Sequence, residues 1–230
     1  MSSVPAARPR SWWLSLPGSL LLAALASGAL AWWLVALPVA TFSNLAKHSG
    51  HFVLVYLHML GGTLTLFLGA ANLYIGLTRR GFRYHRSVGT AYLAGGTVNA
   101  CAAIVLALGQ VHDPARAFSF DLGRVPGEGV ALATLALAWL VASAMGWRAV
   151  RNRRVSALRA WMTRSYVLTW SFVTCRLINR APFLAALAGV GRGEALPWLS
   201  WIVPLLVCEV ALQWRAGARE ARGGAGRAAA

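Results

Sequence analysis

Long apolar runs separated by short arginine-rich segments form the dominant pattern of this sequence. A helix needs about 20 apolar residues to cross roughly 30 Å of hydrocarbon, and runs of that kind recur along the chain. They predict transmembrane helices at residues 16–40, 51–77, 88–110, 129–147, 162–190 and 196–214. The expected fold is therefore all-α: a polytopic membrane helix bundle of about six transmembrane helices. Its expected parts are an N-terminal segment at 1–15, a transmembrane domain at 16–214 and a basic, flexible C-terminal tail at 215–230.

The first apolar run resembles a secretory signal in one respect, because Arg8 and Arg10 precede it. Its apolar stretch is much longer than the roughly 7–15 residues of a signal peptide, and no clear cleavage pattern of small residues closes it. We therefore expect a retained helix, with a cleaved signal as the alternative.

The basic residues indicate how the helices are oriented. Of the 22 Lys and Arg residues, sixteen fall on the side of the N-terminus, four on the opposite side, and Arg176 and Arg180 within the fifth run. Cytoplasmic loops of membrane proteins carry the excess of positive charge. Both termini are thus predicted to be cytoplasmic.

Composition supports this class of protein and disfavours two others. Hydrophobic residues make up 58% of the chain and charged residues only 12%, which is too apolar for an ordinary soluble domain. The net charge of +16 does not indicate nucleic-acid binding, since the arginines lie in short runs between apolar segments. Cys101, Cys175 and Cys208 lie far apart within apolar segments, so no metal site is predicted from them.

Polar residues follow one face of several predicted helices at the spacing that turns them toward a neighbouring helix. Ordinary helix packing explains many such residues, because glycines bring backbones together and hydroxyl or amide groups bond across helices. The residues form three stripes: His51, His58, Thr65 and Asn72; His85, Gly89, Tyr92, Gly96 and Asn99; and Ser165, Thr169, Arg176, Asn179 and Arg180.

Charged groups at membrane depth are costly unless they are paired or face water. If the fifth and sixth helices form an antiparallel hairpin about a turn near Gly191, Arg176 lies level with Glu209. We expect a structural ion pair between these two residues. Arg180 has no such partner, and it either extends outward or holds an anionic group beside His58.

His58 is the most informative single residue. A buried neutral imidazole with a hydrogen-bond partner is the simpler interpretation, and a haem ligand, metal ligand or proton-relay group is the functional one. His51 lies one heptad away, roughly 10 Å along the helix, so the two cannot share an ion. His85 lies among arginines, where contacts with headgroups or a capping role are the alternatives.

Three stretches of the chain resemble a bacterial family of predicted membrane proteins, domain of unknown function 2306. They are LHMLGGTLTLFLGAANLYIGLTRR from Leu57, the His-Arg-x-x-Gly-x-x-Tyr pattern from His85, and Trp-Met-x-Arg-Ser-Tyr from Trp161, with a later Arg at Arg176. The resemblance implies a helical, multi-pass protein of the bacterial cytoplasmic (inner) membrane, and it implies no activity. Family members commonly carry a His where this chain has Leu158, so a pair of that His with His85 is not formed here.

Three functions remain open at this point. The first is a redox-type bundle in which His58, His85, Arg176 and Arg180 hold a cofactor, either haem b or a quinone. The second is a small permease with an anionic ligand near Arg176, Arg180 and His58, and the third is a non-catalytic accessory subunit in the lipid bilayer. Whether the protein is an enzyme stays open, because no nucleophile elbow, phosphate loop or paired-carboxylate motif is evident.

Overall fold

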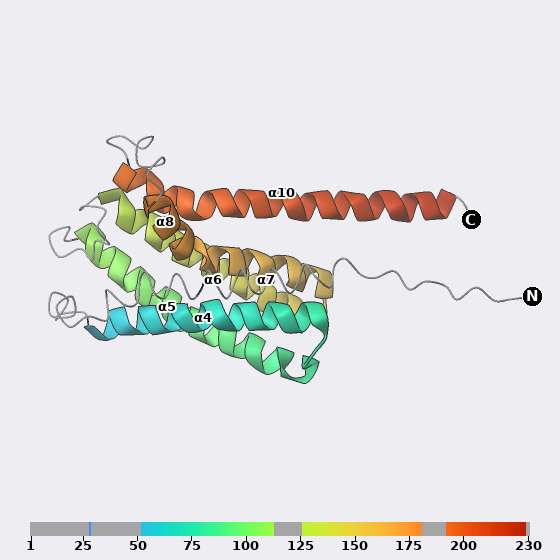
Figure 1. The fold of residues 1–230 in the computed structure, drawn as a ribbon, viewed down its shortest axis with the longest axis horizontal. Coiled ribbons are helices and arrows are strands. Elements are labelled where there is room, and N and C mark those ends of the chain that lie inside the picture. The colour runs from blue at the N-terminus through green and yellow to red at the C-terminus, as the bar shows by residue number, and fades with distance from the viewer. Residues whose placement is uncertain (1–27, 29–51, 113–125, 181–191, 229–230) are drawn as a thin grey trace, which may run out of the picture.

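The computed structural model describes residues 28, 52–112, 126–180 and 192–228 (Figure 1). Within that part of the chain, the regular elements are all helices. This confirms the all-α prediction for the described residues. The elements are α4 (Phe52–Thr78), η4 (Phe82–Tyr84), α5 (His85–His112), α6 (Pro126–Arg151), α7 (Val155–Thr169), α8 (Ser171–Arg180) and α10 (Arg192–Ala228).

Four helices in the described part of the chain are long and apolar enough to cross a membrane. They cover Val53–Thr78, Phe82–Gly109, Gly127–Arg151 and Ala195–Gly217. These spans coincide with the second, third, fourth and sixth predicted helices. The first predicted helix, at 16–40, lies outside the described residues except for Gly28, which is helical and buried. A Cβ at Gly28 would lie 3.3 Å from Leu66 Cδ2, so this position contacts α4.

The fifth predicted helix, at 162–190, differs from expectation because the structure divides the region into α7 and α8. At Trp170 the backbone turns, with φ −76° and ψ −9°, and its N–H is shared between the carbonyls of Tyr166 and Val167. Thr169 and Thr174 each donate a side-chain hydrogen bond to the carbonyl four residues earlier, an arrangement that often bends a helix. Neither α7 nor α8 alone is among the helices long enough to span.

Consecutive long helices run antiparallel, so the short turns α4–α5 and α6–α7 lie at the same end of the bundle (Figure 1). Arginines gather in both turns, and we call this the arginine end and the opposite one the far end. α10 lies along α6, α7 and α8 and extends beyond them at the arginine end (Figure 1).

The C-terminal segment expected to be a flexible tail continues α10 as a helix as far as Ala228. This part of α10 extends beyond the other helices, and a Cβ at Gly217 would meet nothing within 4 Å. A helix of this kind receives little tertiary support, since most helical stability in proteins comes from packing.

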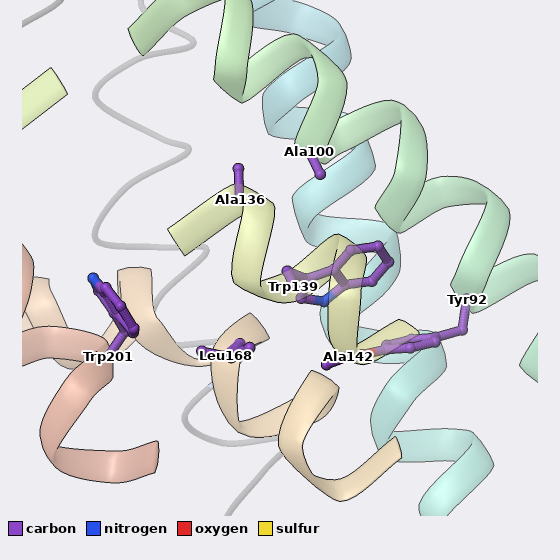
Figure 2. Packing of buried hydrophobic residues seen from close by; sticks show 7 residues of the cluster. All are labelled: Tyr92, Ala100, Ala136, Trp139, Ala142, Leu168 and Trp201. Carbon is purple, nitrogen blue, oxygen red and sulfur yellow. The ribbon is translucent and has the colours of Figure 1, made fainter. Parts of the chain in front are cut away.

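The core is rich in small and aromatic residues, whereas many large aliphatic residues face outward. Tyr92 reaches from α5 toward Ala142 and Trp139 on α6, and Trp201 of α10 lies on the other side of the cluster (Figure 2). On the outside, Val210 is 67% exposed and Val207 65% exposed. This inverted distribution is unfavourable in water and is what a lipid environment allows, because lipid tails solvate Leu and Val while small residues let helices approach closely.

Candidate functional site: the polar face of the α4–α5 hairpin

α4 and α5 meet along a line of polar residues that repeats in opposite order on the two helices. His58, Thr65 and Asn72 follow one another at intervals of seven residues on α4, and His85, Tyr92 and Asn99 do so on α5. Because the helices are antiparallel, His58 lies beside Asn99 at the far end and Asn72 lies beside His85 at the arginine end. The sequence stripes on these two helices therefore face each other.

At the far end, glycines bring the helices into close contact around His58 and Asn99. A Cβ at Gly61 would lie 3.0 Å from Asn99 Cβ and 3.1 Å from the Gly95 carbonyl oxygen, and one at Gly62 would lie 3.5 Å from Asn99 Oδ1. His58 Nδ1 and Asn99 Oδ1 are both buried and form no hydrogen bond of good geometry with a described residue, although the imidazole lies close enough to Asn99 for a weak one.

The arginine end has the same arrangement, except that here α5 contributes the His and α4 contributes the Asn. A Cβ at Gly76 would lie 3.3 Å from His85 Cε1, and one at Gly89 would lie 3.1 Å from Asn72 Nδ2. His85 Nδ1 and Asn72 Oδ1 are again buried without a hydrogen bond of good geometry in the described part of the chain, although the imidazole lies near the Asn72 backbone. Here Phe82 stacks on the His85 ring, with 5.1 Å between ring centroids.

The two His–Asn pairs are separate sites. Asn99 is fourteen residues beyond His85 on α5, which corresponds to about 21 Å along the helix. His58 and His85 cannot therefore bind one iron or one quinone together. A haem between α4 and α5 does not fit either, because the glycine contacts bring the two backbones together where the flat macrocycle would lie.

Between the two pairs, the bundle contains a buried cluster of hydroxyl groups. Tyr92 Oη lies 2.8 Å from Ser165 Oγ and 3.2 Å from Thr169 Oγ1, and Ser143 Oγ lies 2.9 Å from Ser165 Oγ. Trp139 Nε1 donates to Thr169 Oγ1 at 3.0 Å. The stripes predicted Tyr92, Ser165 and Thr169 to face neighbouring helices, which is confirmed. They did not include Ser143 and Trp139, because a lone serine and a lone tryptophan form no stripe.

Two glycines make room for the rings of this cluster. A Cβ at Gly96 would lie within the space of the Trp139 ring, and one at Gly69 within that of Tyr166 and close to Tyr92. The Tyr166 hydroxyl also donates to the Leu66 carbonyl at 3.4 Å. The centre of the bundle is thus closely packed, and its hydroxyl groups bond to one another.

Glu209 forms an ion pair, and the partner in the structure is Arg164. Arg164 Nε donates to one carboxylate oxygen at 2.8 Å and Nη2 to the other at 2.9 Å, while its guanidinium lies 4.8 Å above the Trp161 ring. The sequence predicts Arg176, twelve residues further on, as the partner of Glu209, on the assumption of one straight fifth helix. The helix is divided at Trp170, and the pairing with Arg176 stays a prediction.

The sequence also singles out Arg176, Arg180 and Leu158. Arg176 and Arg180 belong to α8, but their side chains lie outside the described residues, so their roles stay predictions. Leu158, at the position where the resembling family carries a His, is half-buried in the first turn of α7. Among the described residues, no group of three or more His, Cys, Asp or Glu side chains could hold a metal ion.

These features define an integral membrane protein: a helix bundle with lipid-compatible outer surfaces and a polar interior. The chain belongs to the DUF2306 family of predicted membrane proteins, whose pattern matches residues 55–212. That match extends past the resemblance seen in the sequence and includes most of the apolar part of α10. No characterised protein and no solved structure matches the chain.

Proposed function

We propose that this protein is a redox-type membrane protein that binds a quinone at the His58–Asn99 pair. The observation that supports this is that two buried polar atoms, His58 Nδ1 and Asn99 Oδ1, lie close together within membrane-spanning helices without a hydrogen bond of good geometry. An unsatisfied polar group in hydrocarbon costs several kcal/mol, so such a pair favours a ligand with complementary groups.

The chemistry of the pair suits both oxidation states of a quinone. An imidazole that carries its proton on Nδ1 donates a hydrogen bond to a quinone carbonyl, whereas an amide oxygen accepts one from a quinol hydroxyl. The lipid tail of such a ligand would lie against the outward-facing aliphatic residues of α4, such as Leu60, which is 59% exposed. Entry from the bilayer needs no aqueous channel.

Quinone is favoured over haem b as the cofactor. Either ligand needs α4 and α5 to separate at Gly61 and Gly62, where the two backbones are in contact, and the haem macrocycle needs far more separation than a single quinone ring. Arg176 and Arg180, proposed as partners of an anionic group such as a haem propionate, belong to α8, and α8 packs on α10. An absorbance spectrum of the purified protein distinguishes the two, because only haem gives a Soret band.

A second candidate function is that of a non-catalytic accessory subunit. The observation in its favour is the close glycine packing, together with the fully bonded hydroxyl cluster around Tyr92, since both features describe a rigid bundle. In that case the His58–Asn99 pair would be an interhelical contact with imperfect geometry. Nothing in the described residues favours the permease alternative.

Quinone binding is testable on the full chain purified in detergent. Quenching of tryptophan fluorescence by a short-tailed quinone gives an affinity, since the chain contains 11 tryptophans. His58→Ala and Asn99→Ala should each weaken binding about tenfold, which corresponds to the loss of one hydrogen bond of roughly 1.4 kcal/mol. Asn152→Ala, in the exposed α6–α7 turn, is the matched control and should bind as the wild type does.

The accessory function makes the opposite prediction. The wild type would then bind no quinone, extraction of the purified protein would yield none by mass spectrometry, and His58→Gln would melt as the wild type does. A quinone affinity that is equal in wild type and His58→Ala would also reject the site.

We also infer that the arginine end faces the cytoplasm, in a bacterial cytoplasmic membrane, with both chain termini on that side. The excess of arginine in the α4–α5 and α6–α7 turns supports this orientation. Reporter enzymes fused after Arg80 and Arg154 should be active only as cytoplasmic reporters. A periplasmic signal at both sites would reverse the assignment.

A further inference from the structure

The arginine end carries a dense positive surface with no acidic residue in its two turns. Residues 79–86 and 147–159 contain no Asp or Glu. Every arginine of these segments is exposed: Arg79, Arg80, Arg83, Arg86, Arg148, Arg151, Arg153, Arg154 and Arg159. Orientation in the membrane explains an excess of positive charge, but not how these side chains are arranged.

Aromatic rings lie beneath two of these guanidinium groups. Arg79 Cζ lies 4.9 Å from the centroid of Phe82, and Arg83 Cζ lies 4.6 Å from that of Tyr84. The short helix η4 places both rings at the surface, where Phe82 is 48% and Tyr84 51% exposed. Stacking on a ring holds a guanidinium flat and leaves its N–H edge available to another group.

Each of the two turns also places an arginine in the left-handed backbone region. The φ angle is 59° at Arg79 and 55° at Arg153, and these are the non-glycine residues with positive φ in the described chain. Helices usually end with Gly or Asn in this conformation, because a longer side chain is strained there. An arginine therefore stands in each turn at a position where glycine would be less strained.

The surface is continuous with residues that face lipid. Leu77 at the end of α4, Val150 at the end of α6 and Val155 at the start of α7 are each about half exposed. Trp147 and Trp214, both exposed and near the ends of their spans, are of the type enriched at headgroup level. The guanidinium groups therefore lie where phospholipid phosphates lie, at the edge of the hydrocarbon.

We propose that the arginine end is a binding surface for anionic phospholipids, in which the arginines of the two turns bind headgroup phosphates. A guanidinium forms two parallel hydrogen bonds to a phosphate, which an ammonium group does not. The ring-stacked Arg79 and Arg83 and the strained Arg153 are the residues on which selectivity depends. This surface is separate from the His58–Asn99 pair, and the proposal stands whether or not a quinone binds there.

The experiment compares lipids added to the full chain in a neutral detergent, with melting temperature and native mass spectrometry as readouts. Phosphatidylglycerol should raise the melting temperature and remain bound, whereas phosphatidylcholine and inorganic phosphate should do neither. Each of Arg79→Gln, Arg83→Gln and Arg153→Gln should weaken phosphatidylglycerol binding roughly fivefold, the contribution of one arginine near a charged surface. Raising the salt concentration to 0.5 M should weaken it further.

Arg192→Gln is the matched control, because α10 begins at that residue, at the far end of the bundle. It should bind phosphatidylglycerol as the wild type does. Equal stabilisation by phosphatidylcholine would overturn the proposal, and so would undiminished binding of phosphatidylglycerol by Arg79→Gln, Arg83→Gln and Arg153→Gln together. Binding of inorganic phosphate with the same dependence on these arginines would assign the surface to a soluble anion instead.

Discussion

The centre and the two ends of the α4–α5 interface are built differently, although they belong to the same heptad pattern. At the centre, the hydroxyl of Tyr92 bonds to Ser165 and Thr169 on α7. At the ends, the His58–Asn99 and Asn72–His85 pairs each leave an imidazole nitrogen and an amide oxygen without a hydrogen bond of good geometry. The described chain contains one other such atom, Trp201 Nε1 on α10.

This difference distinguishes buried polar residues that stabilise the fold from buried polar residues that are available to bind a ligand. A buried polar network stabilises and specifies a fold when its members are satisfied, and it is unfavourable when they are not. Residues such as Tyr92 and Thr169 therefore contribute to folding, whereas the end pairs contribute little to stability. Mutations at the centre should reduce stability, and mutations at the ends should change what the protein binds.

The largest loss of stability is expected from Gly96→Ala at the centre. The added methyl group would occupy the space of the Trp139 ring and displace the indole from Thr169. Overpacking of this kind costs typically about 1–3 kcal/mol, and the broken hydrogen bond places this case near 3 kcal/mol. Gly109→Ala on the same helix is the control, since a Cβ there meets nothing within 4 Å. Similar melting temperatures for the two variants would contradict the packing at the centre.

A loss of roughly 2 kcal/mol is expected from Arg164→Leu or Glu209→Leu, because each leaves one charge at membrane depth without its partner. The double variant should lose less than the sum of the two, and melting temperatures of the set give the coupling. Arg176→Leu combined with Glu209→Leu should instead be additive. Coupling of the Arg176 pair without coupling of the Arg164 pair would make Arg176 the partner of Glu209.

The sequence predicted most of the fold because the hydrophobic signal of a membrane helix is strong and local. The four long spans lie within a few residues of the predicted positions, since about 20 apolar residues have few alternative structures. The break at Trp170 was not predicted, because it arises from hydroxyl groups that bond back to carbonyls within a segment whose composition is otherwise uniform.

The candidate site was predicted only in part. The seven-residue spacing placed His58, Asn72, His85 and Asn99 on helix faces, but a single helix does not show which residue lies opposite which. The pairing of each His with an Asn follows from the register of α4 against α5, which the glycine contacts set. The bond of Glu209 to Arg164 was not predicted for the same reason, because the sequence does not show the register of α10 against α7.

The smallest effects on stability are expected at the two ends of the α4–α5 hairpin. They test most directly whether the ends are less important for stability than the centre. His58→Leu and His85→Leu each remove a nitrogen that has no hydrogen bond of good geometry in the described structure, and they keep an apolar side chain in its place. Replacing an unsatisfied polar group by an apolar one is nearly neutral or stabilising, so both variants should melt within about 0.5 kcal/mol of the wild type, or above it. Tyr92→Phe, which removes a hydroxyl of the satisfied cluster, should lose about 1 kcal/mol. His85→Leu should fall slightly below His58→Leu, because the His85 ring also stacks on Phe82. Losses of 2 kcal/mol or more in both histidine variants would show that the imidazoles are bonded in the membrane and that the ends are as structural as the centre.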